Sequence, residues 1–423
     1  MSKSLEEIFT KERMLESAYK VRRKKSAGVD GISAKRAVEI VENNYSTLFN
    51  EIITGKYKPK AVKVIHIPKQ GTVAETRPIA IGTACDRIIQ NTMVTAIQDE
   101  FDKNMSDYSF GFRKERNCIQ AVNTLVELIK SGYAYIVKLD MTGCFNHLNH
   151  DRILYLLRKV LPAEDMKLIN AFLKVELVEQ NSRKRNYIGA PQGSALSPLY
   201  ANLILSVVDI ELEKRNHPFI RYADDIYILC RSEKAAIRTL SGITNFIEKK
   251  CNLKVNTKKS SICNIDDGVN VLGFRLYQTH ADIHIVPSPG RINRIKDKIK
   301  TICSAGSNEE IINNLNNTIR GWTNYYSVSE MNQVSKDLDF LIKKQITKAE
   351  KRNGSKIDRR LLLSCNNLYS KIRHQHMMET KGTKKKALSA DDAGTVNQVQ
   401  MEETAALLLY RERSPPSSTL TIP

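Results

Sequence analysis

Several common signatures are missing from this sequence of 423 residues. Its eight cysteines are scattered without a C-x-x-C pair, and its eight histidines form no H-E-x-x-H. Neither pattern therefore indicates a zinc site or a disulfide framework. Apolar runs such as AALLLY (405–410) are far too short to cross a bilayer, and the charged N-terminal stretch MSKSLEEIFTKERM is unlike a secretory signal. The expectation is a cytoplasmic protein with buried, reduced thiols.

Acidic residues are few relative to basic ones. The 66 lysines and arginines against 46 aspartates and glutamates give a net charge of +20. Such an excess favours a polyanionic partner, with nucleic acid ahead of an acidic membrane. A basic surface alone does not separate an enzyme from a binding module, so the chemistry has to come from a site.

Two adjacent aspartates, Asp224 and Asp225, interrupt the apolar stretch FIRYADDIYILC (219–230). The aromatic and β-branched residues on either side predict two strands, with the aspartates at the tip of a β-hairpin. Aspartate is also a common turn residue. This stretch by itself therefore leaves a purely structural turn open.

A third carboxylate, Asp140, ends the apolar run in YIVKLDMTGCF (135–145), and a helix is expected to begin near 149–151. If this strand pairs beside the hairpin, three carboxylates converge at one end of a sheet. Their mutual repulsion raises a pKa or calls for a counter-ion. Mg²⁺ is the natural counter-ion, and a pair of such ions about 3.5–4 Å apart serves in-line phosphoryl transfer. We therefore expect two Mg²⁺ ions, for which Mn²⁺ can substitute.

Together with GAPQGSALSPLYANLIL (189–205), these features resemble a reverse transcriptase, and more closely the polymerases encoded by bacterial and organellar group II introns. The resemblance covers roughly residues 15–345, and its further blocks follow the family order. These blocks are RRKKSAGVDGIS (22–33), YKPKAVKVIHIPKQGTVAETRPIAIGTACDRIIQ (57–90), SFGFRKERNCIQAV (109–122), VNTKKSSI (255–262) and VNVLGFRL (269–276). The resemblance implies an α+β right-hand polymerase, with an antiparallel sheet in the fingers and palm, followed by an all-α thumb or maturase domain.

The resemblance and the shifts in composition divide the chain into five segments. These are an N-terminal extension (1–50), fingers and palm (51–285), a helical thumb or maturase domain (286–345), a basic nucleic-acid-binding segment (346–386) and a tail expected to be disordered (387–423). VPSPG (286–290) marks the start of the helical region, because two prolines and a glycine interrupt regular structure. Within it, SNEE (307–310) is a capping box that predicts a helix start at Ser307.

The family's metal triad falls on Asp140, Asp224 and Asp225, and the backbone carbonyl of Met141 is implied as a further metal ligand. The matching positions are expected to be catalytic, because they would hold both ions. Three separate structural turns are the alternative.

Five further residues match the family's dNTP-binding positions: Lys69, Arg77, Phe145, Gln192 and Lys259. Lys69 and Arg77 are expected to hold the triphosphate. Phe145 would leave no room for a ribose 2′-hydroxyl, and Gln192 would lie beneath the sugar and base. Lys259 matches a lysine near the triphosphate, although its neighbour Lys258 leaves that choice open.

The Gln192 segment is expected to be positioned by the helix that follows it. In GAPQGSALSP, Ser197 and Pro198 predict the N-cap and the first helical position.

Basic and turn residues in several blocks match nucleic-acid contacts, and a solvated basic surface is their alternative. The candidates are Arg22, Arg23, Lys24, Arg113, Lys114, Arg116, Gly273, Arg291, Arg294 and Lys298. Because such contacts go to phosphates, affinity should fall steeply with salt. Trp322, in IRGWTNYYSV (319–328), is expected to serve packing rather than RNA stacking.

The sequence thus predicts an RNA-directed DNA polymerase that acts on an RNA template, a DNA primer or target and dNTPs, away from membranes. The resemblance adds binding of group II intron RNA to assist splicing and mobility, in a bacterial cytoplasm or an organellar matrix. One alternative is a group II-like reverse transcriptase in phage defence or a CRISPR-linked function. Another is an RNA-binding splicing factor with an inactive polymerase, against which three intact aspartates argue.

Overall fold

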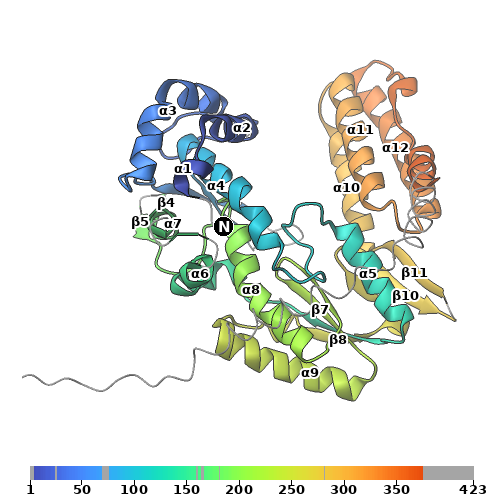
Figure 1. Ribbon diagram of the computed structural model, residues 1–423. Coiled ribbons are helices and arrows are strands. Elements are labelled where there is room, and N and C mark those ends of the chain that lie inside the picture. Colours follow the sequence, from blue (N-terminus) through green and yellow to red (C-terminus); the bar gives the residue numbers. More distant parts are fainter. Residues whose placement is uncertain are drawn as a thin grey trace, which may run out of the picture. The chain divides into compact units, whose positions relative to one another are not determined.

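A computed structural model describes residues 4–23, 26–68, 76–158, 161–162, 166–180, 182–280 and 282–374. The chain divides between Cys263 and Asn264 into two compact units (Figure 1). The predicted boundary at 285/286 lies within the second of these units, and the five-segment division stays a prediction. The predicted tail, 387–423, lies outside the described residues.

The first unit begins with helices packed around a long, largely buried helix, α4 (Figure 1). These helices are α1 (Leu5–Ile8), α2 (Lys11–Val21), α3 (Ala37–Ile53) and α4 (Ala84–Asp102). Polar side chains cap their first turns: Thr10 accepts from the Arg13 amide, and Thr83 accepts from the Asp86 amide. Met14 and Ala18 of α2 are fully buried, which gives this helix its inward face.

A four-stranded sheet follows, in the order β2-β1-β4-β5. Its strands are β1 (Val62–Pro68), β2 (Thr76–Ile81), β4 (Glu176–Glu179) and β5 (Ser182–Arg185). The β1–β2 and β4–β5 pairs are antiparallel, whereas β1 and β4 run parallel. This sheet is therefore mixed, and the expectation of an antiparallel sheet is corrected here because a segment distant in sequence docks on β1.

The central sheet of the first unit has the order β6-β7-β3-β8. Its strands are β3 (Tyr135–Leu139), β6 (Phe219–Tyr222), β7 (Asp225–Cys230) and β8 (Ser261–Asn264). Helix α5 (Cys118–Lys130) packs on β6, and α9 (Glu233–Phe246) packs on β3 and β7. Beyond Asp225, β7 is buried along its whole length, as expected of an interior strand in a helix-covered sheet.

Helices α6 (His150–Leu157), α7 (Met166–Leu173) and α8 (Ser197–Lys214) complete the first unit. The predicted start of α6 is confirmed, because Asn149 caps it. The predicted cap of α8 is wrong by one position. Ser197 is already helical, Leu196 occupies the N-cap without a side-chain bond, and the Ser197 hydroxyl donates to the Pro191 carbonyl at 2.7 Å.

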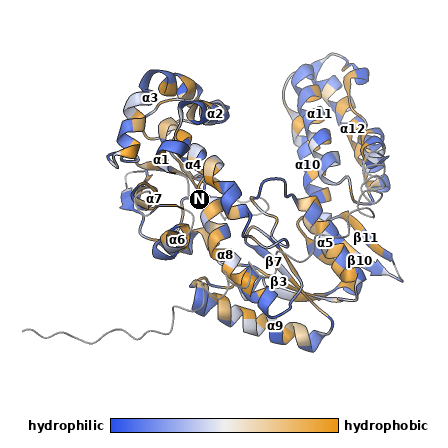
Figure 2. Ribbon diagram, in the orientation of Figure 1, coloured by the Kyte–Doolittle hydropathy of each residue, from blue (hydrophilic) through white to orange (hydrophobic). Residues whose placement is uncertain are grey.

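The second unit combines an antiparallel meander with a run of helices. Its elements are β9 (Val269–Val271), β10 (Phe274–Thr279), β11 (Asp282–Pro287), α10 (Pro289–Ser304), α11 (Asn308–Tyr325) and α12 (Asn332–Asn353). Residues 365–374 are also helical. Apolar and polar residues alternate along α10–α12 (Figure 2), and the inward face of α10 buries Ile295 and Ile299. The predicted capping box of Ser307 and Glu310 is confirmed.

The fold prediction is confirmed, since an α+β region is followed by an all-helical one. No helix in the described ranges combines the length and apolarity needed to cross a membrane.

Candidate active site

The three predicted carboxylates lie at the same end of the central sheet. The hairpin register pairs Tyr222 with Asp225, which confirms the predicted hairpin and leaves Ala223 and Asp224 as its two-residue loop. Strand β3 pairs antiparallel with β7, and Leu139 faces Ile226. Asp140 directly follows Leu139 and Asp225 directly precedes Ile226, so both carboxylates lie at this end of the sheet.

Burial and mutual repulsion perturb two of these carboxyl groups. Burial raises the pKa of Asp224, the neighbouring Asp140 raises it further, and the charges of Arg77 and Arg221 oppose the rise. Burial, followed by the charge of Asp224, raises the pKa of Asp225 to about 6. Both groups are therefore held in surroundings that disfavour their anions, a condition that a bound cation relieves.

Asp140 is held by the loop that precedes β8. Its carbonyl accepts from the Asn256 amide at 2.8 Å, and its amide donates to the Ser260 hydroxyl at 3.1 Å. Lys259, whose amide donates to the Asn256 carbonyl at 3.1 Å, lies in this loop. The structure thus places the predicted Lys259 segment against the Asp140 backbone. Ser260 was not predicted, because nothing in VNTKKSSI singles out one hydroxyl.

The donors at this end of the sheet fit a hard divalent cation. Carboxylate oxygens and a backbone carbonyl are ligands that Mg²⁺ accepts. Met141 and Val255 form an isolated antiparallel bridge. Its two hydrogen bonds join the Thr142 amide to the Lys254 carbonyl and the Asn256 amide to the Asp140 carbonyl, so the Met141 carbonyl takes part in neither. Within the described ranges, no three or more His, Cys, Asp or Glu side chains already gather as a metal-binding group. The two-ion site therefore stays a prediction.

Phe145 lies on a short 3-10 helix, Cys144–His147, directly after β3. Its half-buried ring meets Phe112 edge-on, with ring centroids 6.3 Å apart. Its carbonyl accepts from the Ala190 amide at 2.7 Å. This bond fixes the GAPQG segment against the residue that is predicted to select the sugar.

Gln192 is tied to β2. Its carbonyl accepts from the Ala80 amide at 2.6 Å. The next residue, Gly193, has φ +116°, and a Cβ there would lie 2.4 Å from the Ala80 carbonyl oxygen. Only glycine permits this close approach. Arg77 lies on the same strand, so β2 joins the positions of Arg77 and Gln192, whereas Lys69 lies outside the described residues.

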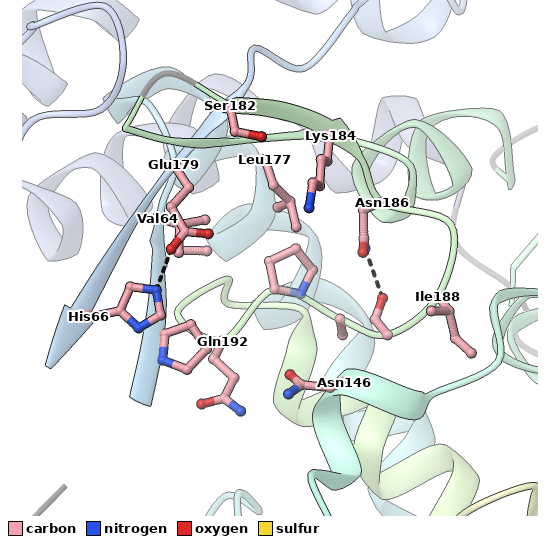
Figure 3. Close-up of a pocket in the computed structure, with 15 residues that line it drawn as sticks. Val64, His66, Asn146, Leu177, Glu179, Ser182, Lys184, Asn186, Ile188 and Gln192 are labelled. Carbon is pink, nitrogen blue, oxygen red and sulfur yellow. Dashed lines mark hydrogen bonds and ion pairs between the residues drawn. The ribbon is translucent and has the colours of Figure 1, made fainter. Parts of the chain in front are cut away.

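A pocket of about 340 Å³ opens beside Gln192 (Figure 3). One wall is the face of the β2-β1-β4-β5 sheet that carries His66, and His66 Nε2 lies 2.6 Å from the Glu179 carboxylate. The side chain of Lys184 extends from β5 toward the pocket, on the side opposite Gln192 and Asn146 (Figure 3). The sequence did not predict this pocket, because no motif marks the strands at 176–185.

Three basic candidates in the turn before α5 lie in different environments. Arg113 is buried, its guanidinium pairs with Asp102 at 2.5 Å, and it donates to the Ser106 and Ser109 carbonyls. We correct the expectation for Arg113, because a buried side chain saturated by these acceptors holds the turn and cannot reach a phosphate. Lys114 is exposed, 3.6 Å from an Asp99 carboxylate oxygen, and Arg116 pairs with a neighbouring aspartate at 2.7 Å.

The remaining nucleic-acid candidates fall in two places. Arg22 and Arg23, at the end of α2, are exposed, and Lys24 lies outside the described residues. In the second unit, three basic candidates occupy one exposed side of α10 at helical spacing, and these are Arg291, Arg294 and Lys298.

Aromatic side chains hold the Gly273 turn of the second unit. Gly273 has φ +88°, and its carbonyl accepts from the Tyr326 hydroxyl at 3.1 Å. The Tyr325 hydroxyl donates to the neighbouring Leu272 carbonyl at 2.7 Å. Trp322 packs on Tyr326, with ring centroids 4.2 Å apart. The packing predicted for Trp322 is therefore seen.

Comparisons with known proteins identify the families whose sequences this chain resembles. Residues 67–276 match the family model "Reverse transcriptase (RNA-dependent DNA polymerase)", and residues 292–361 match "Group II intron, maturase-specific domain".

Group II intron-encoded protein LtrA of Lactococcus lactis subsp. cremoris is 31% identical over 188 residues, 44% of this chain and 31% of that protein. The putative COX1/OXI3 intron 1 protein of Saccharomyces cerevisiae is 25% identical over 285 residues, 54% of this chain and 34% of that one. Protein YkfC of Escherichia coli is 25% identical over 293 residues, 59% of this chain and 75% of its own. The chain thus spans about a third of the yeast and lactococcal relatives.

Proposed function

The chain belongs to the reverse transcriptase family and carries a group II intron maturase-specific domain, and from this premise we propose that it is an RNA-directed DNA polymerase. It would join dNTPs to a primer 3′-hydroxyl on an RNA template. The convergence of Asp140, Asp224 and Asp225 at one sheet end carries this proposal. Asp224 and Asp225 both have raised pKa values, and adjacent carboxyl groups of this kind are typical of functional sites rather than of stabilising ones.

The residues around the carboxylates have separate tasks in the proposed reaction. Asp140, Asp224 and Asp225 would hold Mg²⁺, which when bound neutralises charge on the attacking oxygen and on the departing pyrophosphate. Arg77 would bind the triphosphate bidentately, and its charge already acts on Asp224. Phe145 would exclude a 2′-hydroxyl.

Primer extension tests the polymerase directly. The wild-type chain is incubated with poly(rA)/oligo(dT), dTTP and either Mg²⁺ or Mn²⁺, and elongated primers are expected. Asp224→Asn should lower the rate by about 10³-fold, the scale seen when a charge-stabilising group is lost. Asp337→Asn, an exposed carboxylate on α12, should leave the rate unchanged. Failure of the wild type with both metals would favour an RNA-binding module with an inactive polymerase.

The sugar-selecting role of Phe145 has its own test. Phe145→Val removes the ring beside the GAPQG segment and should raise ribonucleotide incorporation relative to deoxynucleotide incorporation. Phe112→Val, which removes the ring that meets Phe145 edge-on, serves as the matched control. Unchanged discrimination in Phe145→Val would remove this role.

The RNA partner is proposed to be a structured group II intron RNA, bound to assist splicing and mobility. The maturase-specific match over 292–361 and the intron-encoded relatives support this proposal. Sequencing the RNA that copurifies with the chain tests it, because an intron RNA flanking the gene is expected. Recovery of an RNA from a defence or CRISPR-linked locus would instead favour the alternative function with the same active site.

The exposed basic side of α10 supplies a measurable part of this binding. Replacing Arg291, Arg294 and Lys298 by alanine removes three candidate phosphate contacts, and the slope of log affinity against log salt should fall by about 2–3. Lys336→Ala, an exposed lysine on α12, should change the slope by no more than about 1. An unaltered slope in the triple variant would exclude this surface.

A further inference from the structure

Arg221 is the largest fully buried side chain in the described structure. It lies on β6, three residues before Asp224. Its guanidinium makes two parallel bonds to the Asp209 carboxylate, from Nε at 2.7 Å and from Nη2 at 2.6 Å. Its Nη1 donates to the Asn202 side chain at 2.8 Å and to the Ala223 carbonyl at 3.1 Å. One side chain thus joins helix α8 to the tip of the hairpin.

The turn that Arg221 reaches is strained. Ala223 has φ +59°, in the left-handed region that costs a non-glycine residue about 1–2 kcal/mol. Such a conformation persists only where the surroundings over-determine it. Ala223 directly precedes Asp224, so its conformation sets the direction in which the Asp224 side chain leaves the backbone.

A second contact closes the other side of the turn. A Cβ on Gly111 would lie 2.1 Å from the Ala223 nitrogen, so this backbone packs directly on the loop. The Gly111 carbonyl accepts from the Asn202 side chain at 2.9 Å. Asn202 therefore bonds both to Arg221 and to the segment that covers Ala223.

Stability does not account for this arrangement. Burying a guanidinium and a carboxylate costs several kcal/mol per ion, and well-packed apolar residues of similar volume are often as stable or more so. The pair does provide a planar, directional donor aimed at the Ala223 carbonyl.

We propose that Arg221, anchored by Asp209 and Asn202 of α8, is a positioning residue that holds the Ala223–Asp224 turn so that the Asp224 carboxylate meets its cation. This inference deepens the proposed function and rests on it. Arg221 itself is fully buried, so it acts through the Ala223 carbonyl and the turn.

The main test separates positioning from stability. The double variant Arg221→Met/Asp209→Leu removes both buried charges and the bond to Ala223, and its thermal midpoint should stay within a few degrees of wild type. Its kcat for dTTP should fall by about 10²-fold, the scale of a small misplacement of a reacting group, with KM changed less than about threefold. Wild-type kcat in a folded double variant would overturn the proposal.

A control pair on the same helix guards against a general effect on α8. Arg215 pairs with Glu211 at 2.6 Å, outside the hairpin network. Arg215→Met/Glu211→Leu should leave kcat within about twofold of wild type, because this partly exposed pair joins two positions at the end of α8 and not the hairpin tip. A loss equal to that of the first double variant would show that α8, not the turn, is responsible.

Two further measurements keep the test decisive. Electron paramagnetic resonance measures the affinity for Mn²⁺ in the absence of primer and nucleotide. This affinity should be at least about fivefold weaker in the double variant, and an unaltered affinity would contradict the positioning role. This readout stands even if the wild type extends no primer, so the two proposals fail separately. If the double variant does not fold, Arg221→Lys is used instead, because lysine keeps the positive charge but lacks the several planar donors of the guanidinium. Wild-type kcat and wild-type Mn²⁺ binding in Arg221→Lys would overturn the proposal.

Discussion

The pKa values of the carboxyl groups are shifted in opposite directions in the two units. In the first unit, every described aspartate or glutamate with a resolved shift has a raised pKa, and these are Asp86, Glu213, Asp224 and Asp225. In the second unit, every such group has a lowered pKa, and these are Glu310, Glu350 and Asp358. Burial is the largest cause in the first unit, whereas hydrogen bonds to the anion dominate in the second. The acids with shifted pKa values in the second unit hold helix ends and loops, whereas those in the first unit are shifted mainly by burial.

Burial alone does not make a site, as Asp86 shows. Its carboxylate accepts from Tyr57 at 2.7 Å, from the Thr83 hydroxyl at 2.6 Å and from the Lys60 amide at 3.3 Å. Asp224 and Asp225 differ because each is also raised by a neighbouring carboxylate. Like-charged neighbours therefore distinguish Asp224 and Asp225 from Asp86. Glu213 has such neighbours as well, and it is the place of Asp224 and Asp225 beside Asp140 at the end of the sheet that marks the candidate site.

Removing Asp86 should give the largest effect on stability. Asp86→Ala leaves the half-buried Tyr57 hydroxyl without its carboxylate acceptor, and the first unit should lose about 2–3 kcal/mol. Hydrogen exchange of the α4 amides measures this loss unit by unit. Asp107→Ala, an exposed carboxylate paired with Arg116, should change the same amides by less than about 0.5 kcal/mol. Equal effects would mean that Asp86 is not a structural anchor.

Asp225 should respond to pH in the sense opposite to an ordinary carboxylate. Its pKa of about 6 in the folded chain lies above the usual value, so the folded state holds the proton more tightly than the unfolded state does. Without metal, acidification from pH 7 to pH 5 should therefore add to the stability of the first unit. The test is hydrogen exchange of the β3 and β7 amides in EDTA, for the wild type and Asp225→Asn. The variant should show a smaller gain on acidification, and an identical gain would contradict the assignment.

Local patterns in the sequence predicted the hairpin, the strand at Asp140 and the capping box. Each depends on residues within a few positions of one another, such as the aromatic and β-branched residues that flank Asp224. The pairing of the strand that ends at Asp140 with the hairpin was a hypothesis, and the register of β3 with β7 confirms it. The fold prediction was thus confirmed where local propensity and the motif agreed.

Contacts between distant segments could not be predicted in the same way. Arg113 was predicted to be a phosphate contact, because a sequence does not show that Asp102 will bury its guanidinium. Asp209 is one of many acids on a helix, and nothing in its neighbourhood marks it as the partner of Arg221. Strands β4 and β5 lack a motif, so the sheet they complete and the pocket beside Gln192 became visible only in three dimensions.

Glu350 is an acid of the second unit whose pKa is lowered, unlike the pKa of Asp225 in the first unit. Its carboxylate accepts from the Ile357 amide and from Arg359, each at 3.0 Å. These bonds lower its pKa, so its contribution to stability is present at neutral pH and is lost as the pH falls through the folded value. Glu350→Gln should destabilise the amides near residue 357 by about 1 kcal/mol at pH 7, and by less at pH 4. Glu309→Gln, an exposed acid on α11, is the control, and a pH-independent loss in Glu350→Gln would contradict the charge-based account.

The capping box at Ser307 should give the smallest effect of this series. Its hydroxyl accepts from the Glu310 amide at 3.3 Å, and the Ser307 amide donates back to Glu310 at 2.9 Å. Ser307→Ala removes the first bond and the 3.1 Å bond that the hydroxyl donates to the Glu310 carboxylate, and it should raise exchange of the first α11 amides by an amount equivalent to about 0.5 kcal/mol. The amides of α4 in the first unit should not change. Because the backbone bond that lowers the pKa of Glu310 survives in this variant, the acid-dependent part of the cap should persist. Its disappearance would show that the hydroxyl, rather than the backbone amide, holds the carboxylate in place.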